Sequence, residues 1–60
     1  MTRPYALRRL LEHGPLTLAE LLDITRWPYR ATQAMLTRLQ EEGRIAVERV
    51  SAHRNVYRNA

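Results

Sequence analysis

The chain has 60 residues, ten arginines and no lysine, six acidic residues and no cysteine, so its formal net charge is +4. A chain this short accommodates a single domain, here residues 1–60. The absence of cysteine excludes a disulfide framework and cysteine zinc sites. No apolar run reaches the roughly 18 residues that span a bilayer. We therefore expect a cytoplasmic protein that has no membrane partner and binds an anionic one.

The first helix is expected over residues 4–13. Pro4 suits the first turn of a helix, where its missing N–H is not needed, and Gly14 followed by Pro15 ends the helix. Leu16 is then expected to be extended and to pair, as a one-residue strand, with a hairpin further along the chain. One face of this helix carries three leucines at helical spacing, namely Leu7, Leu10 and Leu11.

A second helix begins after Thr17. Thr17 and Glu20 have the spacing of a capping box, in which each side chain bonds to the other residue's backbone N–H. We expect this helix to end near Leu22 or Asp23, because no apolar stripe continues beyond them and Pro28 disfavours helical geometry in the residue before it. The short helix is thus followed by a tight break.

The third helix is expected from Pro28 through Glu42, with Gly43 ending it. At 100° per residue its buried side contains Thr32, Met35, Leu36 and Leu39. From Arg44 the pattern becomes that of a strand, with Ile45 and Val47 on one side. A second short strand is expected over residues 55–58, and residues 51–54 form the turn of a basic hairpin.

With a short second helix, a tight break, a longer third helix and a basic hairpin, the whole chain resembles the winged helix-turn-helix domain of MarR-like and IclR-like bacterial regulators. The matching segments are residues 18–22, residues 35–43, which read MLTRLQEEG, and residues 56–58, which read VYR. The chain departs from the family at Arg26, where a small residue is usual, and at Pro28, where serine or threonine is usual. The resemblance implies a mainly α fold with three helices and a C-terminal wing of two or three strands, and it implies double-stranded DNA binding.

The start of the third helix is the expected base-reading segment. Recognition helices place their N-terminal residues against base edges in the major groove. Arginine suits guanine and glutamine suits adenine, whereas alanine and threonine can contact a thymine methyl group. We therefore predict base contacts by Arg30, Gln33, Ala34 and Thr37. The alternative for Arg30 and Gln33 is an ordinary solvated helix face.

Contacts with the DNA backbone are expected from the turn and from the hairpin. The predicted residues are Arg26, Tyr29, Arg49, His53 and Arg54. Arginine and histidine in the hairpin would lie on phosphates or in a minor groove, and the alternative is a mobile polar hairpin. Trp27, in the same turn, is expected to anchor the core rather than to stack on a base.

Enzymatic functions are disfavoured by the residues present. The chain has two histidines forty positions apart, two glycines, no cysteine nucleophile and no phosphate-binding glycine loop. We expect no cofactor, no catalytic or metal site and no small-molecule substrate. The expected function is a small, nucleoid-associated transcriptional regulator that acts as a homodimer, beside a partner protein, or as an accessory factor of a phage or plasmid. The alternative is a winged-helix adaptor that binds protein without contacting DNA.

Overall fold

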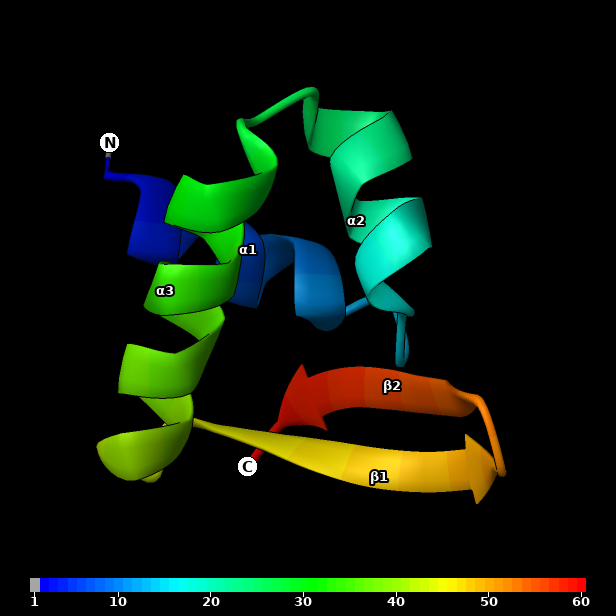
Figure 1. The fold of residues 1–60 in the computed structure, drawn as a ribbon. Helices are drawn as coiled ribbons and strands as arrows, with labels where there is room; N and C mark the ends of the chain where they lie inside the picture. Colours follow the sequence, from blue (N-terminus) through cyan, green and yellow to red (C-terminus); the bar gives the residue numbers. More distant parts are fainter. Residues whose placement is uncertain (1) are drawn as a thin grey trace.

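The computed structural model describes residues 2–60, which form three helices and one antiparallel hairpin (Figure 1). In Figure 1 α2 and α3 stand on either side of α1, and the hairpin crosses below the helices. The protein is therefore a mainly α domain with a small hairpin, as the sequence predicts. Within residues 2–60 no helix is long and apolar enough to cross a membrane. The elements in chain order are α1 (Arg3–Leu11), α2 (Leu18–Thr25), α3 (Tyr29–Glu41), β1 (Ile45–Ser51) and β2 (Arg54–Asn59).

Helix α1 is two residues shorter at its C-terminal end than predicted. The Thr2 hydroxyl caps its start by accepting the Tyr5 N–H at 3.3 Å. The prediction that the helix continues to His13 is wrong, because the Glu12 and His13 N–H groups bond to carbonyls three residues back in a tighter turn. Gly14 then reverses the chain with a φ of +134°.

Helix α2 confirms its predicted start and corrects its predicted end. The Thr17 hydroxyl accepts the Glu20 N–H at 3.1 Å, and the Glu20 carboxylate accepts the Thr17 N–H at 2.8 Å. The end predicted near Leu22 or Asp23 is wrong, because backbone hydrogen bonding continues without an apolar stripe as far as Thr25. Arg26 stops the helix in the left-handed conformation, with its N–H on the Leu22 carbonyl at 2.9 Å.

Helix α3 lies within one residue of its predicted limits at both ends. Pro28 precedes it without a side-chain cap, Glu42 follows it, and Gly43 has a φ of +74°. Thr32 is buried at 1% exposure, but its hydroxyl donates to the Pro28 carbonyl at 2.8 Å. The buried polar group is therefore satisfied within the first turn of the helix.

The core confirms the helical faces that the sequence predicts. Trp27 is half-buried and packs on this core, which confirms its predicted role as an anchor, and the Arg3 guanidinium lies 5.8 Å from the centre of its ring. Each fully buried leucine stabilises the fold by about 1.5–3 kcal/mol through loss of contact with water. The buried apolar cluster consists of Leu7, Leu11, Leu21, Leu36, Leu39 and Ile45.

The hairpin is tied to the helices by a short third segment. Leu16 and Tyr57 exchange two backbone hydrogen bonds, of 3.0 and 2.7 Å, which confirms the predicted one-residue strand. β2 is one residue longer at each end than predicted, and the turn is reduced to residues 52–53. Ile45 and Val47 alternate on β1 as expected, but only Ile45 is buried, because Val47 is 45% exposed. The hairpin thus extends beyond the core.

Candidate nucleic-acid interface

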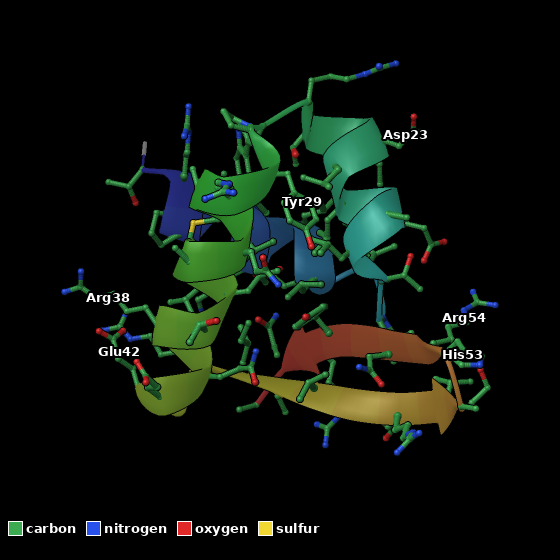
Figure 2. The ribbon with its side chains drawn as sticks, in the orientation of Figure 1. Asp23, Tyr29, Arg38, Glu42, His53 and Arg54 are labelled. Atoms are coloured by element: carbon green, nitrogen blue, oxygen red, sulfur yellow. The ribbon has the colours of Figure 1, made fainter. Side chains whose placement is uncertain are left out.

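The four residues predicted to read bases share one exposed face of α3. Arg30, Gln33, Ala34 and Thr37 are all exposed and, together with Tyr29, line an open hollow of about 450 Å³. Tyr29 lies between α3 and α2 in Figure 2 and is 53% exposed. The opposite face carries the buried residues of the core. The fold therefore leaves the predicted reading face accessible to a ligand.

The N-terminus of α3 is electrically positive. The helix begins without a side-chain cap and has no acidic residue in its first turn. Its free N–H groups and its macrodipole therefore favour a negative ligand at this end. Arg30 adds a full positive charge in the same turn. The N-terminus of α2 differs, because Thr17 caps it and Glu20 supplies a negative charge.

The arginines divide into two groups by their distance from carboxylates. Arg9, Arg38, Arg44 and Arg58 form ion pairs of 3.4 to 4.0 Å. Within residues 2–60 the other six arginines have no such pair, and Arg26, Arg30, Arg49 and Arg54 are among them. Every arginine predicted to contact DNA is therefore unpaired, and none of the paired arginines was predicted to do so.

Arg26 occupies an unusual position in the turn before α3. Its φ of +61° is the only left-handed value at a non-glycine residue in the described part of the chain. In this conformation a Cβ atom approaches the following carbonyl, at a cost of about 1–2 kcal/mol. The side chain is exposed, and it has no hydrogen-bond partner within residues 2–60. The fold places it near the N-terminal end of the reading face.

The hairpin predictions fall at the tip of the sheet. His53 and Arg54 lie at the end of the hairpin that is far from Arg38 and Glu42, as Figure 2 shows. Arg49 is also exposed, but its guanidinium donates to the carbonyls of Ser51 and Ala52 at the tip. Among residues 2–60, by contrast, the side chains of Arg54 and His53 have no hydrogen-bond or ion-pair partner.

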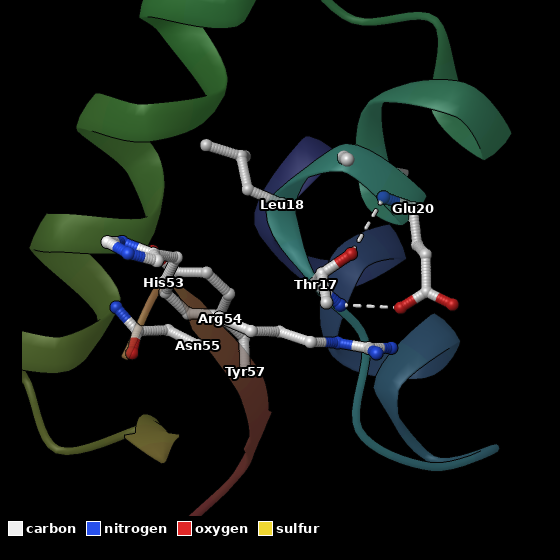
Figure 3. A pocket seen from close by; sticks show the side chains of 8 residues that line it. Thr17, Leu18, Glu20, His53, Arg54, Asn55 and Tyr57 are labelled. Carbon is white, nitrogen blue, oxygen red and sulfur yellow. Dashed lines mark hydrogen bonds between the residues drawn. The ribbon is translucent and has the colours of Figure 1, made fainter. Parts of the chain in front are cut away.

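A second hollow, which sequence reasoning missed, joins the hairpin tip to the start of α2. It has a volume of about 560 Å³ and includes Asn55 and residues 17–20. Figure 3 shows that Arg54 extends toward the Thr17–Glu20 capping box, whereas His53 and Asn55 point away from it. The sequence shows the capping box as the start of a helix. That Arg54 of the hairpin lies beside it depends on tertiary structure and cannot be read from local spacing.

Glu20, in the capping box, is an acidic residue whose pKa is affected by hydrogen bonds from Thr17 and by the charge of Arg54. Hydrogen bonds from the Thr17 backbone and side chain lower the pKa of the Glu20 carboxyl, and the charge of Arg54 lowers it further. The carboxylate is thus held by its own helix start, and it forms no ion pair with Arg54 at 4.0 Å or less. Within residues 2–60 no cluster of histidine and acidic side chains is arranged to hold a metal ion.

No protein-family model, curated protein or solved structure is significantly similar to this chain. The function is therefore inferred from the residues and geometry of the chain itself.

Proposed function

We propose that this chain is a winged helix-turn-helix domain that binds double-stranded DNA. In the proposed complex α3 enters the major groove, with Arg30 and Gln33 against base edges and Ala34 and Thr37 beside them. The hairpin is the wing, and Arg54 and His53 lie on the backbone or in the adjacent minor groove. The biological role proposed is that of a small transcriptional regulator.

The observation that carries this proposal is the division of the arginines. A phosphate competes poorly for a guanidinium that already contacts a carboxylate, and it gains most from one that has no acidic partner. Arg26 and Arg30 flank the start of α3, and Arg54 lies at the hairpin tip. These unpaired charges supply the nonspecific attraction to DNA, which depends on how many phosphates are neutralised.

The topology supports the same proposal. A short helix, a tight turn, a longer helix with an exposed polar face and an antiparallel hairpin follow one another in the chain. The Leu16–Tyr57 bridge adds a third segment beside β2, as a wing of two or three strands requires. The exposed face of α3 presents donors and small side chains to a groove and has its acidic residue, Glu41, at the far end.

The test is a salt titration of binding to short DNA duplexes. For the parent protein log K should fall steeply as log salt rises, with a slope of about −0.9 for each neutralised phosphate. Arg54→Ala should weaken binding to all duplexes alike and make the slope shallower by about 0.9. Arg30→Ala should instead relax base preference, with a loss of about 1–3 kcal/mol on the preferred duplex.

Arg38→Ala is the matched control, because it removes the same charge from the same helix but from an arginine paired with Glu42. It should change the slope least. Weak binding that is insensitive to salt, or equal losses for Arg30→Ala and Arg38→Ala, would contradict the proposal. The first of these results would favour the protein-binding adaptor.

A further inference from the structure

The tip of the hairpin closes without the residues that tight hairpin turns usually need. Two-residue loops favour turns with positive φ, and therefore glycine, asparagine or aspartate. Here the loop is Ala52-His53, and within residues 2–60 positive φ occurs only at Gly14, Arg26 and Gly43. The turn at the tip therefore lacks the backbone conformation that matches the twist of its strands. Another feature has to hold it.

A bulge and one side chain meet at this point. The strand register shifts between Arg49 and Ser51, so Val50 has no partner on β2. The Arg49 Nε donates to the Ser51 carbonyl at 3.4 Å, and its Nη2 donates to the Ala52 carbonyl at 3.2 Å. One guanidinium thus spans the bulge and holds two consecutive carbonyls, the last of β1 and the first of the turn. Only arginine has a planar fork that can do this, because lysine donates from a single nitrogen.

We propose that Arg49 is a positioning residue that orders the tip of the hairpin, rather than a phosphate contact. Its effect is to hold His53 and Arg54 in place before a ligand arrives. The functional part of this inference depends on the proposed DNA binding, because an ordered tip avoids an entropic cost on association. The structural part depends only on the two hydrogen bonds and the bulge.

The experiment compares Arg49→Lys and Arg49→Gln with the control Arg58→Gln. Arg58 lies on the same hairpin but contacts Glu48 and the Asn59 carbonyl instead of the tip. Backbone ¹⁵N relaxation of the free proteins should give Ala52 and His53 order parameters of about 0.85 in the parent. Both Arg49 variants should lower these values toward about 0.6, and Arg58→Gln should leave them unchanged.

Duplex binding then separates positioning from direct contact. Arg49→Lys keeps the charge, so a positioning role predicts about two- to tenfold weaker binding, the cost of ordering a loose tip, with an unchanged salt slope. If Arg49 instead contacts a phosphate, Arg49→Lys should keep the order parameters and the affinity of the parent. Arg49→Gln should then reduce the salt slope of binding by about 0.9. That result would overturn the inference.

Failure of the proposed function gives a different result. If the parent does not bind duplex DNA in a salt-dependent way, the DNA proposal fails. The relaxation data on the free proteins still decide whether Arg49 orders the tip. Tip order parameters that are equal in the parent and in both Arg49 variants would contradict the positioning role whatever the ligand is.

Discussion

At the C-terminal end of α3 one carboxylate pairs with two arginines, because Glu42 forms ion pairs of 3.4 Å with both Arg38 and Arg44. At the N-terminal end Arg26 and Arg30 have no comparable partner within residues 2–60. The two ends thus carry the same type of cation in different surroundings. The net charge of +4 does not distinguish the two ends, whereas the pairing of each charge does.

The helix dipole increases this difference. Cations are favoured near a helix C-terminus and anions near an N-terminus. Arg38 and Arg44 therefore stabilise the C-terminal end of α3. The N-terminal end has no side-chain cap, so a negative ligand would be favoured there. One end of the helix is thus neutralised by ion pairs, and the other is left open for the proposed ligand.

The largest effect is expected from removing the core packing of α3, which holds both ends of the helix in place. Leu36→Ala, at a site with 1% exposure, should destabilise the domain by about 2–5 kcal/mol. A 60-residue domain has a total stability of about 3–9 kcal/mol. Urea unfolding followed by circular dichroism should therefore show a partly or largely unfolded variant. Leu36→Met, which keeps the volume, should cost less than about 1.5 kcal/mol. An alanine variant as stable as the parent would contradict the packing of α3.

A smaller effect sharpens the comparison at the N-terminal end. Arg26→Gly should be neutral or more stable by up to about 1 kcal/mol, because glycine adopts the left-handed conformation without a Cβ clash. Duplex binding by the same variant should be weaker and its salt slope shallower by about 0.9. Arg26→Gln, which keeps the strained backbone, should lose binding without the gain in stability. Parent-like binding by both variants would remove Arg26 from the interface.

The smallest effect tests whether pairing or position separates the two ends. Glu42→Gln removes the carboxylate that holds Arg38 and Arg44, with a change in stability of about 1 kcal/mol or less, because both ion pairs are exposed. We expect tighter, more salt-dependent duplex binding. Glu12→Gln is the control, because it changes the net charge equally but frees only Arg9 on α1. An equal gain for both variants would mean that net charge alone determines the affinity.

The sequence predicts the parts of this molecule that depend on near neighbours. The capping box at Thr17 and Glu20 and the buried face around Leu36 follow from spacing alone, and both are confirmed. The end of α2 does not follow from spacing, because it depends on the backbone conformation of Arg26 and not on an apolar pattern.

Features that join distant segments were less accessible to prediction. The pairing of Leu16 with the hairpin could be anticipated, since an extended residue between two helices needs a partner for its backbone. The hollow between Arg54 and the start of α2 depends on how the hairpin lies against the helices. The bonds from Arg49 to the tip depend on a one-residue shift in register. Local spacing contains neither piece of information.

The bridge between Leu16 and Tyr57 also bears on how the chain folds. It joins residues from opposite parts of the sequence, and Asn59 adds a bond from its side chain to the Arg8 carbonyl at 3.0 Å. A contact of such long sequence separation needs a large loop to close, which costs chain entropy, so we expect it to form late in folding. The hairpin, which is proposed to contact DNA, is thus also hydrogen-bonded to α1. We expect the hairpin and α1 to unfold in a single transition.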